Sequence, residues 1–213
     1  MTAGAWLDAV CAATPELSRG ARAQLPASPR SIVVIGGSGA GKTTVVDAVR
    51  AAALPGVAVP ERRVTRPSRP DDHPREAVPR DAATFAAEVD AGALGLCWQR
   101  TLGARRERYG FVATPAELLA VYSANLALVA PDAGVTPPTA LDGALIVVVT
   151  APSPVRAARL RARSPGLGAD ELASRDREEV PPGHVELDNR DDARAAGAAL
   201  VALVRAVVAV RGS

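Results

Sequence analysis

Residues 31–44 read Ser-Ile-Val-Val-Ile-Gly-Gly-Ser-Gly-Ala-Gly-Lys-Thr-Thr. The first five form a short apolar run, which is typical of a buried strand in a parallel sheet. Residues 36–43 match the pattern G-x-x-x-x-G-K-[ST] in full, and a helical stretch follows from about 42 to 53. A strand, a glycine loop and a helix in this order predict a nucleotide-binding phosphate loop at residues 36–44.

Each residue type in this phosphate loop suits a triphosphate. Glycines let the backbone turn tightly enough for N–H groups to face phosphate oxygens, and the start of the helix adds positive potential. Lys42, the chain's single lysine, is expected to reach the β- and γ-phosphates as a catalytic group, and Thr43 to offer its hydroxyl to Mg²⁺. We therefore expect ATP and Mg²⁺ as cofactors, bound through Gly36, Gly37, Ser38, Gly39, Ala40, Gly41, Lys42, Thr43 and Thr44.

Composition narrows the class of protein. The chain has 213 residues, 48% of them hydrophobic and 23% charged, which is ordinary for a globular protein. A net charge of +2 is too small to argue for nucleic acid or a membrane as partner, and there is no apolar run of 18 residues. No signal peptide is visible, and two cysteines are too few for a disulfide framework. We expect a cytoplasmic protein.

The remaining sequence alternates apolar runs with helical stretches. Residues 1–30 are expected to form a helical extension, with a helix over 3–25. Further strands are expected at 57–65, 94–98, 109–112, 124–130, 144–150 and 184–187, and a basic loop at 100–108. Helices are expected after Asp81, Thr114 and Ser153, and at 170–179 and 191–210. This alternation predicts an α/β fold with a parallel sheet and helices on both faces.

A phosphate loop alone does not separate kinases from GTPases and motor ATPases. The chain lacks the guanine-reading pattern N-K-x-D, and the strand at 144–150 does not end in the Asp or Asp-Glu of ATPases. Phosphoryl transfer depends on positioning and charge neutralisation, which arginines and Mg²⁺ can supply. The small chain therefore favours a small-molecule kinase.

Residues 62–70 read Arg-Arg-Val-Thr-Arg-Pro-Ser-Arg-Pro and contain T-R-x-x-R. With the phosphate loop before them and Phe85, Trp98 and Tyr109-Gly110 after them, they resemble the guanylate kinase superfamily over roughly residues 31–210. The resemblance implies a three-layer P-loop kinase fold for residues 31–213. It also implies a small acceptor-binding insert at about 60–112 and a lid at about 160–180.

The resemblance also assigns roles to individual residues. In this superfamily the two arginines of T-R-x-x-R grip the acceptor's phosphate, which gives that role to Arg66 and Arg69. Tyr109 is similar to a tyrosine that contacts the same phosphate. Arg159 and Arg163 lie four residues apart, on one helix face, and resemble the catalytic arginines of the lid.

Within the superfamily, the order Val64-Thr65-Arg66-Pro67, His73, Phe85, Trp98 and Tyr109-Gly110 resembles ribose 1,5-bisphosphate phosphokinase. This makes His73 and Trp98 candidate substrate-binding residues and ribose 1,5-bisphosphate the preferred acceptor, giving phosphoribosyl diphosphate. Trp98 stands about where guanylate kinases carry the acid that reads guanine. The long basic link at 99–108 and Ser164-Pro165-Gly166 in the lid depart from this branch, so a different acceptor is allowed.

Three alternatives stay open: guanylate kinase converting GMP to GDP, a kinase for a specialised biosynthetic acceptor, and a non-catalytic guanylate-kinase-like interaction module. An intact Lys42-Thr43 pair argues against the module, which needs no phosphate loop. The expected partner is a phosphorylated small molecule, and a homodimer is allowed.

Overall fold

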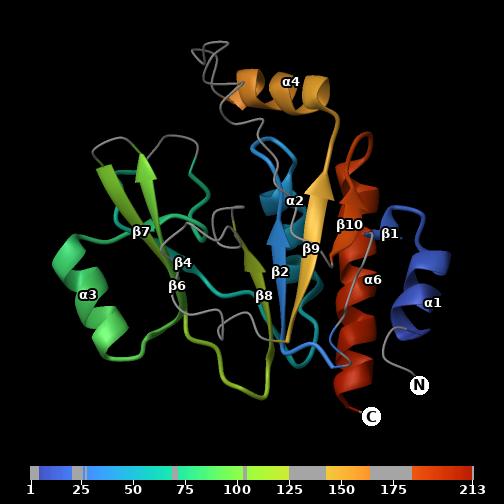
Figure 1. Ribbon diagram of the computed structural model, residues 1–213, viewed down its shortest axis with the longest axis horizontal. Helices are drawn as coiled ribbons and strands as arrows, with labels where there is room; N and C mark the ends of the chain where they lie inside the picture. Colours follow the sequence, from blue (N-terminus) through green and yellow to red (C-terminus); the bar gives the residue numbers. More distant parts are fainter. Residues whose placement is uncertain are drawn as a thin grey trace.

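The computed structural model describes residues 5–20, 26, 28–68, 72–102, 105–124, 143–163 and 184–212. Its main sheet has six strands in the order β1 (Leu17–Arg19), β10 (Val185–Asp188), β9 (Ala144–Thr150), β2 (Ser31–Ile35), β8 (Leu119–Ser123) and β3 (Val57–Ala58) (Figure 1). All neighbouring pairs are parallel except β1 with β10. The predicted α/β class with a parallel sheet core is confirmed.

The central strand β2 supplies apolar side chains to both faces of this sheet. Ile32 and Val34 belong to one hydrophobic cluster, whereas Val33 and Ile35 belong to another. Successive side chains of a strand point to opposite faces, and all four are fully buried here. The continuous apolar run therefore reflects a strand that is covered on both sides, as expected for a parallel sheet.

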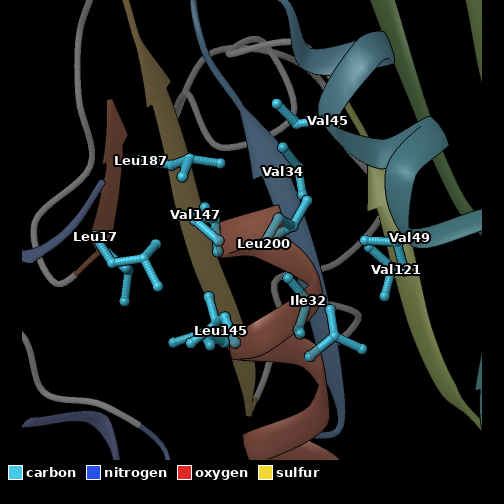
Figure 2. Close-up of a cluster of buried hydrophobic side chains, with 14 of the residues drawn as sticks. Leu17, Ile32, Val34, Val45, Val49, Val121, Leu145, Val147, Leu187 and Leu200 are labelled. Carbon is cyan, nitrogen blue, oxygen red and sulfur yellow. The ribbon is translucent and has the colours of Figure 1, made fainter. Parts of the chain in front are cut away.

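Three helices cover the first face: α1 (Ala5–Ala13), α2 (Lys42–Ala52) and α6 (Ala193–Arg211). Figure 2 shows Leu200 of α6 among side chains of the strands, with Val45 and Val49 of α2 beside them. Helices α2 and α6 approach closely because Gly197 has no side chain. A Cβ there would lie 2.8 Å from the Cβ of Ala48.

Helix α6 has 19 residues and a window of mean hydropathy 1.9, so by length and composition it could cross a membrane. The helix does not contain an uninterrupted apolar run of 18 residues, because Arg194 and Arg205 lie within it. Leu200, Leu203 and Val207 of this helix are buried in the core of the domain. Core packing thus accounts for its apolar character.

A second, four-stranded sheet covers the other face in the described part of the chain. Its order is β5 (Val78–Pro79), β4 (Arg62–Val64), β7 (Arg105–Val112) and β6 (Leu94–Leu102), with helix α3 (Ala82–Asp90) beside it (Figure 1). Val64, Leu96 and Phe111 of this sheet form one cluster with Val33 and Ile35. In the described part of the chain, the second sheet thus packs on the face of the main sheet that carries Val33 and Ile35.

Several predicted elements have other bounds. The N-terminal helix ends at Ala13, and residues 17–19 pair with β10 as an edge strand instead of continuing the helix. The extended segment 57–65 divides into β3 and β4, which belong to different sheets. In both cases the bounds depend on pairing with strands that are distant in sequence. Such pairing cannot be recognised from a pattern of neighbouring residues.

Two predictions around the second sheet are wrong. No helix starts at Thr114; a turn there leads into β8 at Leu119–Ser123. The expected basic loop at 100–108 is largely strand, because β6 and β7 stay paired from Trp98↔Tyr109 to Leu102↔Arg105. Charged residues suit such a ribbon where it extends from the core. The strand expected at 124–130 and the helix expected at 170–179 lie almost wholly or wholly outside the described residues.

The other predicted elements agree with the structure. Asp81 caps α3 by accepting a hydrogen bond from the backbone N–H of Thr84 at 2.8 Å. Helix α4 (Ser153–Arg163) starts at the predicted serine and lies beyond the carboxyl end of β9 (Figure 1). Strands β9 and β10 and helix α6 also occupy the expected segments. The carboxyl ends of β2 and β9 meet there, which is where ligands bind in open α/β sheets.

Candidate active site

The phosphate loop joins β2 to α2, and its glycines have structural reasons. Gly41 precedes the helix with φ +96°, and a Cβ there would lie 2.2 Å from Nδ2 of Asn189. Gly36 has φ +148°, and a Cβ there would lie 2.4 Å from the carbonyl oxygen of Val149. Only glycine fits both positions, so the loop can turn tightly between β9 and the segment after β10.

Lys42 curls back over the phosphate loop. Its Nζ donates hydrogen bonds to the carbonyl oxygens of Gly36 at 2.8 Å and Gly37 at 3.1 Å. Burial is the main cause that lowers the pKa of Lys42 to about 8; Arg62 lowers it further, and Glu76 opposes the shift. An ammonium group held by carbonyls among other cations favours a bound anion, because a phosphate would restore the missing negative charge.

Helix α4 brings a second cation to the loop. Nη1 of Arg159 lies 3.5 Å from the carbonyl oxygen of Gly39 and 3.4 Å from that of Ala40, and Nη2 donates to the carbonyl oxygen of Asn189 at 2.9 Å. The Asn189 side chain also donates to Ala40 O at 2.6 Å. The structure therefore places Arg159 against the phosphate loop; its part in catalysis stays a prediction.

Two further arginines of α4 act on the same site. Both Arg163 and Arg156 lower the pKa of Lys42 through their charge, and Arg156 is buried. Sequence reasoning named Arg163 and missed the role of Arg156, although Arg156, Arg159 and Arg163 follow the i, i+3, i+7 spacing of one helix face. That spacing was the available signal. The rest of the predicted lid, from residue 164 to 180, lies outside the described residues.

A buried carboxylate approaches the loop from the turn that precedes β5. Oγ1 of Thr43 donates to Oε2 of Glu76 at 2.7 Å, and Glu76 is only 6% exposed. Arg62 holds this segment in place: its Nε donates to the carbonyl oxygen of Glu76 at 2.6 Å and its Nη1 to that of Ser123 at 2.7 Å. Sequence reasoning missed Glu76 and Arg62, because no motif links either to Thr43.

Two of the residues predicted to clamp the acceptor's phosphate, Arg66 and Tyr109, lie after β4 and on β7, which are neighbouring strands. Arg66 pairs with Asp72 through both terminal nitrogens, one of them 2.7 Å from Oδ2, and this hydrogen bonding raises the pKa of Arg66. The hydroxyl of Tyr109 donates to Oε2 of Glu107. Tyr109 also acts electrostatically on Arg66. Both phosphate-binding candidates are thus engaged with carboxylates in this structure.

The remaining substrate-binding candidates are Trp98, His73 and Arg69. Trp98 stacks on Tyr109 with ring centroids 5.1 Å apart, and it is 2% exposed within the second hydrophobic cluster. Nε2 of His73 lies 3.3 Å from Oδ2 of Asp47 on α2. Arg69 lies outside the described residues. Substrate contacts by Trp98 and His73 stay predictions.

Compared with known protein families and with curated proteins, the chain matches none. Solved structures do match. A guanylate kinase from Anaplasma phagocytophilum superposes with a TM-score of 0.51 at 13% identity, over 84% of this chain and 86% of that one. An unliganded sugar kinase from Janibacter sp. gives a TM-score of 0.42 at 16% identity, over 85% of this chain and 98% of that one. The match to the guanylate kinase shows that the chain shares the α/β fold of a P-loop-type kinase.

Proposed function

We propose that this protein is an ATP-dependent phosphotransferase that moves the γ-phosphoryl group to a phosphorylated small molecule. The observation that carries the proposal is the convergence of Lys42, Arg62 and the α4 arginines on a loop with the full phosphate-binding pattern. Lys42 and Arg159 contact this loop directly, and positive charge gathered at one loop attracts a polyanion. The kinase-type fold supports the same class of reaction.

In the proposed reaction, the loop's backbone N–H groups and Lys42 bind the β- and γ-phosphates. Arg159, Arg163 and Arg156 neutralise charge that develops on the transferring group. Thr43 would hold Mg²⁺, which would supply further charge neutralisation. The second sheet presents the acceptor, so that its oxygen is aligned with the γ-phosphorus and water is excluded.

The acceptor is proposed to bind through its phosphate at Arg66, Arg69 and Tyr109. A planar guanidinium pairs phosphate oxygens through two hydrogen bonds, as Arg66 pairs with Asp72 here. An incoming phosphate would take the place of Asp72. The preferred acceptor is ribose 1,5-bisphosphate. This preference rests on the order in which the motifs from Val64 to Gly110 follow one another in the sequence. The protein is proposed to act in the cytoplasm.

Guanylate kinase activity is the second candidate, favoured by the fold shared with the Anaplasma phagocytophilum enzyme. Trp98 argues against it, because an indole that stacks on Tyr109 cannot accept hydrogen bonds from guanine as a carboxylate does. Glu107, whose carboxylate contacts Tyr109, is a carboxylate in this region that could do so.

A coupled ADP-release assay with MgATP separates these candidates. The panel is ribose 1,5-bisphosphate, ribose 5-phosphate, GMP, dGMP, AMP, CMP and UMP. Turnover with the bisphosphate alone supports the preferred acceptor, whereas turnover with GMP replaces it by guanylate kinase. If no compound of the panel supports ADP release and ATP still binds, the acceptor is a specialised one. No rise in melting temperature with MgATP would contradict the proposal and favour the non-catalytic module.

Arg66→Ala is expected to raise the acceptor KM about 10- to 100-fold and leave ADP affinity unchanged. The estimate follows from the roughly 1.5–3 kcal/mol of a hydrogen bond to a charged group. Arg63→Ala is the matched control, because Arg63 lies three residues before Arg66, on β4, and pairs with Glu61 instead. Equal KM increases in both variants would show a general loss of positive charge and not a phosphate clamp.

A further inference from the structure

We propose that Glu76 supplies the carboxylate that, together with the hydroxyl of Thr43, holds the Mg²⁺ of the bound nucleotide. This inference rests on the proposed function and names a ligand that the sequence did not indicate. The strand that often ends in a metal-holding acid, β9, ends here in Thr150. Glu76 would take over that task from the second sheet.

The spacing of the two oxygens fits an octahedral magnesium shell. Mg²⁺ binds oxygens at about 2.0–2.1 Å, so adjacent ligands of an octahedron are about 2.9 Å apart. Oγ1 of Thr43 and Oε2 of Glu76 are 2.7 Å apart. Both oxygens can therefore face one cation with only a small adjustment. The Thr43 hydroxyl would then turn its proton away from Glu76 and offer a lone pair to the ion.

The burial and hydrogen bonding of the Glu76 carboxylate also indicate a cation site. Oε1 of Glu76 is buried and has no hydrogen-bond partner among the described residues. An unpaired buried carboxylate oxygen is costly, and proteins retain such groups chiefly where a ligand uses them. The Arg62 side chain anchors the backbone carbonyl of Glu76 rather than its carboxylate, which leaves this oxygen available.

The donor set suits magnesium rather than a metal held by the protein alone. Among the described residues, no three His, Cys, Asp or Glu side chains lie close enough together to hold a metal ion. Mg²⁺ in phosphoryl-transfer sites needs only one or two protein oxygens, because phosphate oxygens and waters complete the shell. Thr43 and Glu76 provide that number. Lys42 and Arg62 lie near the carboxylate, so they can balance its charge until a cation arrives.

Glu76→Gln tests the proposal through metal binding, without an activity assay. Binding of Mn²⁺ to the ADP complex is followed by the paramagnetic resonance signal of the free ion, with Mg²⁺ as competitor. The variant is expected to lose 10- to 100-fold in metal affinity, the range found when residues around metal sites are changed. It is expected still to bind ADP without metal, because the phosphate loop and Lys42 are unchanged.

Glu61→Gln is the matched control. It makes the same change of charge just before β4, but Glu61 pairs with Arg63 and has no contact with Thr43. It should keep the wild-type metal affinity. Metal affinity within twofold of wild type in Glu76→Gln would overturn the proposal. Absence of ADP binding by the wild type, with or without metal, would instead overturn the proposed function.

A second measurement uses the wild-type protein, in case Glu76→Gln does not fold. Fe²⁺ replaces Mg²⁺ in the ADP complex, and ascorbate with peroxide then cleaves the backbone next to the iron. Mass spectrometry is expected to find cuts both near Thr43 and near Glu76, two positions 33 residues apart in sequence. Cuts near Thr43 alone would overturn the proposal.

Discussion

At the scale of single residues, Lys42 shows how burial changes a side chain that the motif identifies. The motif places an ammonium at the phosphates, but its pKa depends on the neighbours that the fold supplies. Burial and Arg62 lower the pKa of Lys42 to about 8. In the unfolded chain the same group keeps an ordinary pKa near 10.4. Its charged form therefore destabilises the fold below about pH 8, and this cost disappears as the pH rises from 8 to 10.4.

Nucleotide binding should have the opposite pH dependence, because phosphate needs the protonated form of Lys42. We expect ADP affinity to fall by up to about tenfold between pH 7 and pH 9, from the linkage between proton and ligand binding. Isothermal titration calorimetry across this range measures the change. Lys42→Met should bind ADP more weakly and with little dependence on pH. The same pH dependence in both proteins would place the titrating group elsewhere.

At the scale of elements, helix α4 presents one cationic face to the phosphate loop. Arg156, Arg159 and Arg163 lie on this face, and Arg159 reaches Gly39 and Ala40. The helix follows β9, which is parallel to β2, so it starts at the same edge of the sheet as the phosphate loop. The element's orientation, and not its composition alone, makes these arginines candidates for catalysis.

Replacing Arg159 should therefore matter more than replacing a neighbouring arginine. Arg159→Ala is expected to lower kcat/KM for ATP about 10- to 100-fold, from the roughly 1.5–3 kcal/mol of a hydrogen bond to a charged group. Arg161→Ala is the matched control, because Arg161 is exposed on the same helix. It should stay within twofold of wild type. Similar losses in both variants would indicate the overall charge of α4 instead of a contact at the loop.

At the scale of the whole molecule, the N-terminal residues are part of the core. Trp6 and Leu7 of α1 and Leu17 of β1 belong to the same hydrophobic cluster as α6 and the main sheet. Strand β1 pairs with β10 and covers what would otherwise be the sheet's edge. Residues 5–19 thus contribute to the stability of the domain. In the main sheet, β10 and β9 separate β1 from β2, the strand that precedes the phosphate loop.

Leu7→Ala tests this contribution. Leu7 is fully buried, and removing such a side chain leaves a cavity that costs about 2–5 kcal/mol of unfolding free energy. Urea unfolding should show this loss in a single transition. Asp8→Asn, an exposed change in the same helix, should cost less than about 1 kcal/mol, because Asp8 forms a surface ion pair with Arg19. An unchanged midpoint for Leu7→Ala would mean that α1 unfolds separately.

The sequence by itself determined the features that neighbouring residues can specify. The phosphate loop, β2, α2, the Asp81 cap of α3 and the start of α4 each depend on a few consecutive side chains and their backbone preferences. The glycine pattern is an example: Gly41 needs a positive φ that other residues rarely adopt. These local requirements make the parallel core and the candidate nucleotide site predictable.

The tertiary structure alone decided which distant groups meet. Residues 17–19 became an edge strand through β10. Residues 100–102 and 105–108 became paired strands. Glu76, in the turn before β5, came to lie beside Thr43. Strand register, the packing of two sheets and the burial of charge depend on residues far apart in the chain. A local pattern carries no record of such partners, so the carboxylate beside the phosphate loop could be found only after the sheets had been placed together.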